Sequence, residues 1–196
     1  MAPAVILFDL GGVLLPYDQQ RRVRAVSQAL AIDEAAARAA LSPELFRRLD
    51  LGDADDHDFA EAFSHAAARP VTPAEARALI LSVFVAPDAE LWALAARLQA
   101  RTLVGGFSDN PAYVGDLFPP GASLDPMFWS AELGVTKASD AAFAAVEAQL
   151  GRPPGAILFV DDAAANVERA RRRGWDAVHF TSSAALIADF AERALA

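Results

Sequence analysis

The sequence predicts an α/β protein in which helices flank a parallel β-sheet. A block of helices is inserted between the first strand of that sheet and the others. In the second half of the chain, short apolar runs alternate with helical patterns, as in sheets of parallel strands joined by helices. A similar apolar run, residues 4–10, lies near the start. Residues 18–84, between that run and the others, show helical patterns and no convincing strand.

The first predicted strand, residues 4–10, ends at Gly11-Gly12, a pair that favours a tight loop. The next segment has an apolar face formed by Val23, Val26 and Leu30, which predicts a helix. Further helix starts carry N-terminal capping signals. These signals are Ser42-Pro43, then Asp56 or Asp58 ahead of Phe59 and Phe63, and a capping box at Thr72-Pro73-Ala74-Glu75.

From Pro87 onward the chain alternates between helix and strand. The predicted strands are residues 102–107, 127–129, 156–160 and 177–180. The predicted helices begin at residues 87, 138, 163 and 182, and Gly151 and Gly174 end the second and third of them. We therefore expect a Rossmann-like core made of residues 1–15 and 86–196, with residues 16–85 as an inserted helical unit over the sheet.

Composition narrows the classes of function. Of the 196 residues 54% are hydrophobic, enough for a sizeable core, and the net charge of −9 argues against nucleic-acid and anionic-membrane partners. The absence of cysteine excludes disulfides, thiolate nucleophiles and cysteine-bound zinc. Asp9 interrupts the apolar N-terminal run, and no basic region precedes that run, so it is a poor signal peptide and we expect a cytoplasmic protein. The sequence does not indicate an oligomeric state.

Polar side chains follow several predicted strands. Asp9 follows the first strand, Ser108 the second, Asp161 and Asp162 the fourth, and Lys137 precedes the helix after the third. Each one alone is an ordinary cap or turn residue, but the carboxyl ends of parallel strands meet at one edge of a sheet. Carboxylates crowded at that edge repel one another unless a cation neutralises them, and oxygen ligands suit Mg²⁺. Lys137 is also the one lysine among 17 basic residues, which on composition alone indicates either a site that needs a compact ammonium or the chance survival of a single lysine.

Such a set suits a phosphoryl group. Magnesium and an ammonium would neutralise the phosphoryl oxygens, and the Ser108 hydroxyl would donate a hydrogen bond. A carboxylate could then attack phosphorus and form an aspartyl phosphate. Gly11 and Gly12 would let the backbone approach the phosphate closely.

With these motifs in this order, the chain resembles the haloacid dehalogenase superfamily over nearly its whole length. The motifs are Phe8-Asp9-Leu10-Gly11-Gly12-Val13-Leu14, Ser108 after a strand, Gly134-Val135-Thr136-Lys137, and Phe159-Val160-Asp161-Asp162 with Asn166 four residues on. The resemblance implies that Asp9 is the nucleophile and that Asp9, the Gly11 carbonyl and Asp162 hold Mg²⁺, with Asp161 close by. It implies a substrate-binding set of Gly12, Ser108, Asp109 and Lys137, with Ser108 and Lys137 binding the phosphoryl group.

The inserted unit looks like the small α-helical cap of this family, which chooses the substrate and excludes water. The resemblance to bacterial sugar-phosphate phosphatases implies a magnesium-dependent phosphatase for a small phosphorylated metabolite. One departure stands out, because family phosphatases carry a second Asp where this chain has Gly11. That Asp protonates the leaving group and then activates water, which is help worth about 10²–10⁴ in rate. The enzyme is then slow, prefers leaving groups of low basicity, or uses another group such as Asp18.

Other functions are open on the sequence alone. A catalytically weak or inactive module that binds a phosphorylated ligand would keep the fold without the acid at position 11. A receiver-type signalling domain collects similar residues, but it places the acidic pair after its first strand and has no helical insertion. A dehalogenase usually has an aromatic residue at position 11, and a mutase needs the missing acid.

Overall fold

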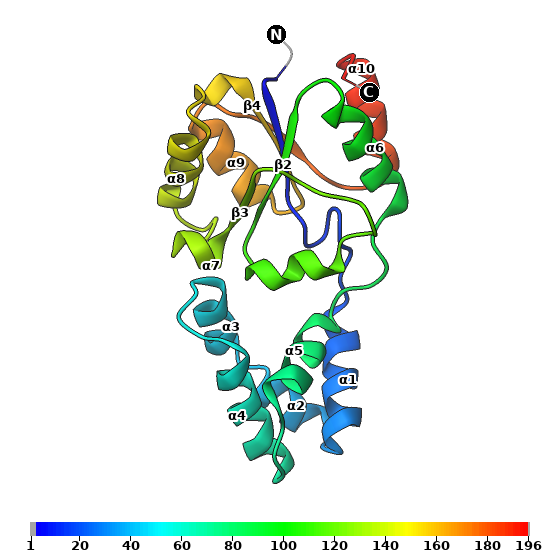
Figure 1. Ribbon diagram of the computed structural model, residues 1–196, viewed down its shortest axis with the longest axis vertical. Helices are drawn as coiled ribbons and strands as arrows, with labels where there is room; N and C mark the ends of the chain where they lie inside the picture. Colours follow the sequence, from blue (N-terminus) through cyan, green and yellow to red (C-terminus); the bar gives the residue numbers. More distant parts are fainter. Residues whose placement is uncertain (1–2, 196) are drawn as a thin grey trace.

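The structure, a computed structural model, describes residues 3–195 and contains one parallel sheet of five strands (Figure 1). The strand order is β3-β2-β1-β4-β5, and every neighbouring pair is parallel. The strands are β1 Val5–Phe8, β2 Leu103–Ser108, β3 Met127–Trp129, β4 Ile157–Asp161 and β5 Asp176–His179. The predicted α/β class is confirmed, and each predicted strand is found within a few residues of its expected position.

Helices cover both faces of the sheet, because side chains alternate between the faces along each strand. Ile6 and Phe8 of β1 pack into one apolar cluster with helices α6 and α10, and Val5 and Leu7 pack into the other with helices α8 and α9 (Figure 1). These helices are α6 Ala89–Gln99, α8 Asp140–Leu150, α9 Ala164–Arg172 and α10 Ser183–Glu192. The central strands are buried on both faces, which explains their continuous apolar runs.

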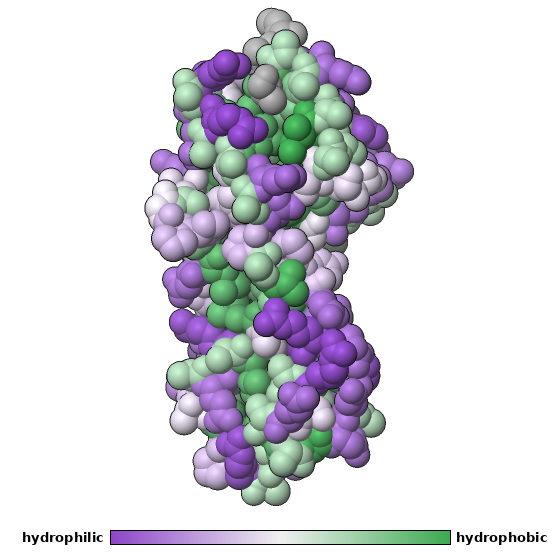
Figure 2. All heavy atoms as spheres, turned by 90° about the vertical axis from the view of Figure 1, so that its right-hand side faces the viewer, coloured by the Kyte–Doolittle hydropathy of each residue, from purple (hydrophilic) through white to green (hydrophobic). Residues whose placement is uncertain are grey.

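Five helices between β1 and α6 form a separate bundle at the end of the molecule away from both chain termini (Figure 1). They are α1 Gln19–Leu30, α2 Glu34–Ala40, α3 Pro43–Asp50, α4 Asp56–Ala67 and α5 Pro73–Leu81. The bundle has its own apolar core, centred on Val26, Phe59 and Phe63. Figure 2 shows that the molecule narrows between the sheet and the bundle, with hydrophobic side chains at that level and many hydrophilic ones over the bundle.

The bundle differs from the predicted helices in small ways. Asp55, rather than Asp56 or Asp58, is the N-cap of α4, and the Asp58 side chain completes the capping box by accepting from the Asp55 backbone. Thr72 caps α5 as predicted, but the Glu75 carboxylate pairs with Arg69 (2.7 Å).

Short elements complete the chain. They are the 3₁₀ helices η1 Ala112–Leu117 and η2 Pro154–Ala156 and the one-turn helix α7 Ser130–Leu133. Within residues 3–195, none of the helices has the length and apolar character that crossing a bilayer requires.

Candidate active site

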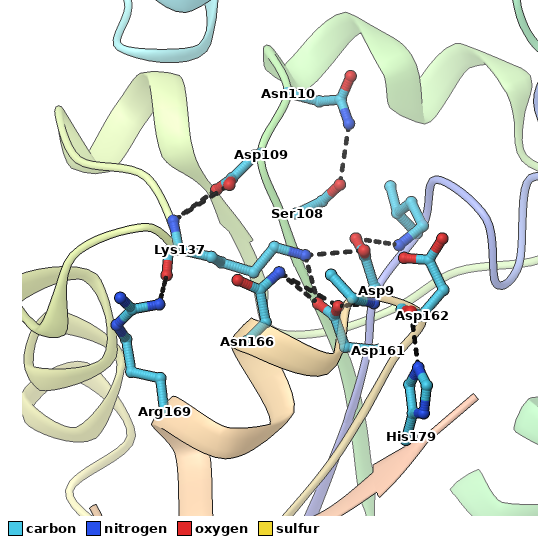
Figure 3. A network of polar contacts seen from close by, with 12 residues as sticks. Asp9, Ser108, Asp109, Asn110, Lys137, Asp161, Asp162, Asn166, Arg169 and His179 are labelled. Carbon is cyan, nitrogen blue, oxygen red and sulfur yellow. Dashed lines mark hydrogen bonds and ion pairs between the residues drawn. The ribbon is translucent and has the colours of Figure 1, made fainter. Parts of the chain in front are cut away.

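The carboxyl edge of the sheet brings the predicted residues together (Figure 3). Asp9 directly follows β1, Ser108 and Asp161 are the last residues of β2 and β4, and Lys137 lies in the loop before α8. All four are buried, with exposed fractions of 7% for Asp9, 2% for Lys137 and 0% for Ser108 and Asp161. The register of β1 between β2 and β4 fixes this arrangement, since Phe8, the last residue of β1, pairs with Gly106 and Val160, which lie within two residues of the ends of β2 and β4.

The Lys137 ammonium bridges two carboxylates. Its Nζ lies 2.8 Å from Asp9 Oδ2 and 2.7 Å from Asp161 Oδ2 (Figure 3). The other oxygen of Asp9 accepts a hydrogen bond from the Leu10 backbone N–H at 2.7 Å. The one lysine of the sequence is therefore held as a buried point charge between the two central carboxylates, where a planar guanidinium would fit poorly.

The charged groups in this cluster shift one another's pKa values. Burial raises the pKa of Asp9 to about 7 although Lys137 lowers it, and the neighbouring Asp161 raises it further. Burial also lowers the pKa of Lys137, but the carboxylates of Asp9, Asp161 and Asp109 outweigh burial and raise that pKa above its ordinary value. Lys137 therefore stays an ammonium, whereas Asp9 needs a further cation to be fully ionised near neutral pH.

Both carboxylate oxygens of Asp161 have hydrogen-bond partners. Besides Lys137, its carboxylate accepts hydrogen bonds from the Ala163 backbone N–H (2.8 Å) and from the Asn166 amide (3.1 and 3.2 Å). With its oxygens so occupied, Asp161 orients the Lys137 ammonium. It has little capacity left to serve as a metal ligand, although it lies in the acidic cluster as predicted.

The acidic cluster as a whole fits a divalent cation. Asp9, Asp161 and Asp162 each offer an oxygen, and these oxygens lie within 4.8 Å of one another. Within residues 3–195 no Lys, Arg or His forms an ion pair with Asp162. Gly12 makes room for it, because a Cβ at Gly12 would lie 2.2 Å from Asp162 Oδ2. An all-oxygen set of Asp9, Asp162 and the Gly11 carbonyl suits Mg²⁺, which is bound in proteins through one or two carboxylates.

Gly12, expected to let the backbone approach the phosphate, has a further structural role. Its φ of +78° favours glycine, and the space beside its Cα is filled by the Asp162 carboxylate. Its backbone N–H donates to the Leu15 carbonyl at 3.1 Å. The glycine is therefore required by the approach of Asp162, and a direct contact of Gly12 with substrate stays a prediction.

The loop after β2 positions two other predicted residues. The Ser108 hydroxyl accepts a hydrogen bond from the Asn110 amide at 3.0 Å, which leaves its own hydrogen free to donate (Figure 3). The Asp109 carboxylate accepts the Lys137 backbone N–H at 2.9 and 3.1 Å. Asp109 therefore positions the Lys137 loop. It also lines the cavity between the sheet and the bundle, and its binding of substrate stays a prediction.

A cavity of about 660 Å³ lies between this edge of the sheet and the helical bundle. Asp9, Asp162 and Lys137 line it from the sheet, and the bundle contributes residues that include Arg22, Phe46 and Asp50. Asp50 and Tyr17 also line the cavity, and neither could be predicted from the sequence, because nothing along the chain places them opposite the strand ends.

Asp18, considered as a stand-in for the acid missing at position 11, does not line this cavity. Its carboxylate caps α1 by accepting the backbone N–H groups of Gln20 and Arg21. Near Gly11 lies instead the ring of Tyr17, 3.7 Å from where a Cβ of residue 11 would be.

No protein-family model matches the chain. Solved structures do share its fold. A haloacid dehalogenase (HAD) family enzyme from Bacteroides thetaiotaomicron has a TM-score of 0.81 and 19% sequence identity, covering 92% of this chain and 95% of that one. A second structure of that enzyme, in complex with magnesium and inorganic phosphate, also has a TM-score of 0.81, with 18% identity and the same coverage.

Two further structures widen the comparison. A predicted HAD-like hydrolase from Porphyromonas gingivalis has a TM-score of 0.81 and 23% identity, covering 97% of this chain and 98% of that one. An L-2-haloacid dehalogenase from Xanthobacter autotrophicus has a TM-score of 0.63 and 21% identity, covering 100% of this chain and 85% of that one. The chain therefore has the HAD-like fold, in agreement with the resemblance predicted from its motifs.

Proposed function

We propose that the chain is a HAD superfamily hydrolase, and specifically a magnesium-dependent phosphatase that acts on a small phosphorylated metabolite through Asp9. The observation that carries this proposal is the cluster of three carboxylates, from Asp9, Asp161 and the half-buried Asp162, in which one ammonium, Lys137, pairs with the first two. Asp9, Asp161, Asp162 and Lys137 together carry a net charge of −2 when all four are ionised, which one divalent cation would balance. A balanced site can then accept a phosphoryl dianion, which an uncompensated acidic cluster would repel.

Each residue has a place in the proposed reaction. The Asp9 carboxylate attacks phosphorus, the bond to the leaving oxygen breaks, and an aspartyl phosphate forms. Bound Mg²⁺ would supply positive charge to the phosphoryl oxygens and to the nucleophile. The Lys137 ammonium offsets the same charge and holds Asp9 at 2.8 Å, and the free hydrogen of Ser108 is available to a phosphoryl oxygen.

The helical bundle α1–α5 fits the proposed role of a cap. It closes the far side of the cavity, and it would exclude water from the reaction while its side chains contact the rest of the substrate. A volume of about 660 Å³ suits a small metabolite, and sugar phosphates are the first class to test. No nucleic-acid or membrane partner is proposed for a chain with a net charge of −9.

Dehalogenation is the second candidate, because an L-2-haloacid dehalogenase shares the fold. The Tyr17 ring beside Gly11 also supplies an aromatic group close to the position where dehalogenases usually carry one. Against this reading, a neutral carbon–halogen centre gives no reason to gather Asp9, Asp161 and Asp162 within 4.8 Å.

Two parallel assays separate these functions. Phosphate release from an aryl phosphate is measured with and without Mg²⁺ for the wild type and Asp9→Asn, and halide release from a 2-haloacid is measured alongside. Mg²⁺-dependent phosphate release that Asp9→Asn abolishes is the expected result. Metal-independent halide release would favour the dehalogenase, and neither activity in a folded protein would favour a binding module.

A further inference from the structure

The proposed phosphatase leaves one chemical task without a residue, and the inference below rests on that proposed function. An alkoxide leaving group must be protonated as its bond to phosphorus breaks, and water must later be deprotonated to release phosphate from Asp9. Position 11 is Gly, so the loop after β1 supplies no acid there. A group elsewhere in the cavity must carry the proton.

The position of the leaving group follows from the position of Asp9. In a phosphoryl transfer the attacking and leaving oxygens lie roughly in line on opposite sides of phosphorus. Asp9 lies at the edge of the sheet, so the leaving oxygen points across the cavity toward the helical bundle. A general acid is therefore expected on the bundle side, within hydrogen-bond reach of the cavity.

Asp50 is the carboxylic acid that the bundle contributes to this cavity. It is the last residue of α3, is partly buried, and lines the cavity together with Asp9 and Lys137. Among residues 3–195, no side chain forms an ion pair with Asp50 and its carboxylate accepts no hydrogen bond from a side chain. Lys137 pairs with Asp9 and Asp161, and its backbone N–H binds Asp109. Asp162, the other acid that lines the cavity, lies on the sheet side and is a proposed Mg²⁺ ligand.

The groups that face Asp50 come from four other segments. They are Arg22 of α1, Asp109 after β2, Tyr113 of η1 and Lys137 before α8, and Arg47 of its own helix lines the same cavity. Burial raises the pKa of Asp50 and Asp109 raises it further, whereas Arg22 and Lys137 lower it, with a result of about 7. At that value both the acid and the carboxylate are present near neutral pH, as a group that first gives and then takes a proton requires.

Other titratable groups near the cavity suit the task less well. Burial and the nearby Asp162 raise the pKa of the Tyr17 hydroxyl above its ordinary 10, which makes it a weaker acid. Asp18 caps α1 and does not line the cavity. Asp109 is held by the Lys137 backbone on the sheet side, where the nucleophile lies.

The geometry points to Asp50 as the catalytic acid and base that replaces the acid missing at position 11. As the P–O bond breaks, the Asp50 carboxyl gives its proton to the leaving oxygen, which departs as an alcohol, and Asp50 becomes a carboxylate. A water molecule then enters the vacated position. Asp50 takes its proton while the water oxygen attacks phosphorus, the bond to Asp9 breaks, and phosphate, the Asp9 carboxylate and protonated Asp50 are restored.

The test compares two substrates that differ in their need for a proton. Values of kcat/KM report phosphorylation of Asp9, and they are measured with Mg²⁺ for an aryl phosphate, whose leaving group is stable as an anion, and for an alkyl sugar phosphate. Asp50→Asn is expected to lower kcat/KM about 10²–10⁴-fold for the alkyl substrate and to change it less than about threefold for the aryl substrate. In the aryl reaction the variant should accumulate phosphorylated enzyme, because water activation is slowed.

Matched variants separate catalysis from folding. Asp53→Asn alters an exposed carboxylate on the same segment, outside the cavity, and should leave both substrates unaffected. Asp50→Glu keeps the acid and should recover part of the alkyl activity. Equal losses of kcat/KM for both substrates, or no loss for the alkyl substrate, would overturn the role of Asp50 while the phosphatase itself stands. Absence of Mg²⁺-dependent turnover in the wild type would instead remove the proposed function, and this inference with it.

Discussion

Replacing Gly12 by alanine perturbs two features whose effects can be separated. The backbone at Gly12 has φ +78°, a left-handed conformation that costs an L-residue roughly 1–2 kcal/mol. Alanine also reduces the freedom of the unfolded chain, which returns about 0.4–1 kcal/mol. The net loss from the backbone is therefore about 1 kcal/mol, or a fall in Tm of about 2–4 °C for a chain of this size.

The second effect of Gly12→Ala falls on Asp162. The new Cβ would lie 2.2 Å from Asp162 Oδ2 and 2.7 Å from its Cγ, and both distances are shorter than the 3.0 Å that a Cβ keeps from atoms not bonded to it. The Asp162 carboxylate must swing away, and the proposed magnesium site then loses a ligand. The wild type should gain about 2.7 kcal/mol of stability at a Mg²⁺ concentration 100 times Kd, and Gly12→Ala should lose most of this gain.

Gly121→Ala is the matched control. Gly121 has nearly the same φ, +79°, but a Cβ there would meet no atom of the described residues within 4 Å. Urea denaturation of the three proteins with and without Mg²⁺ measures both effects. Both variants should lose about 1 kcal/mol without metal, and only Gly12→Ala should lose the response to Mg²⁺. A full Mg²⁺ response in Gly12→Ala would refute the placement of the metal beside Asp162.

Three further predictions follow from the same contacts. Gly11→Asp should fold, because φ is not positive there and the nearest atom to its Cβ is Tyr17 Cδ1 at 3.7 Å. Introduced into Asp50→Asn, it should restore kcat/KM for alkyl phosphates about 10-fold or more, which a phosphate-release assay checks. Phe143→Ala should lower the free energy of unfolding by about 3–5 kcal/mol in urea, because its buried ring packs edge-on against Phe107 with centroids 5.2 Å apart. Burial raises the pKa of Asp50 from 3.8 to about 7, so the Asp50 carboxyl binds its proton more tightly in the folded protein than in the unfolded chain. Ionised Asp50 therefore lowers the stability of the fold as the pH rises from about 4 to about 7. Asp50→Asn should therefore gain stability relative to the wild type between about pH 4 and about pH 8, by at most about 4 kcal/mol, and a constant difference would contradict that pKa.

The residues at the strand ends could be predicted because two rules of chain geometry suffice. Parallel strands place their carboxyl ends at one edge, and a polar residue at the end of an apolar run must face that edge. Asp9, Ser108 and Asp161 obey both rules, and the register of β1 with β2 and β4 brings them to one level. The single lysine of the chain gave an independent signal for Lys137.

The bundle side of the cavity could not be predicted in the same way. Asp50 ends a helix with a polar face, and along the sequence it resembles any solvated acid. Its place depends on how the bundle packs across the edge of the sheet, which involves contacts between residues far apart in the chain. The same reason hides Tyr17, whose ring reaches Gly11 only because the chain turns between Gly11 and Leu15.

The structure gives two of the predicted residues positioning contacts that the sequence did not predict. Asp109 and Gly12 lie in the site, but Asp109 binds the Lys137 backbone and Gly12 makes room for Asp162. Spacing alone does not distinguish a group that contacts substrate from one that positions its neighbour. That distinction depends on hydrogen-bond partners, which are known only once the loops are folded.

Covalent phosphorylation of Asp9 tests the central claim most directly. The wild type would be mixed with Mg²⁺ and an aryl phosphate, quenched in acid during turnover, and digested for mass spectrometry. We predict a phosphoryl group on the peptide that contains Asp9, removed by neutral hydroxylamine as an acyl phosphate is, and absent without Mg²⁺. Phosphate release with no phosphorylated enzyme, or a hydroxylamine-resistant phosphoryl group on Ser108, would contradict it.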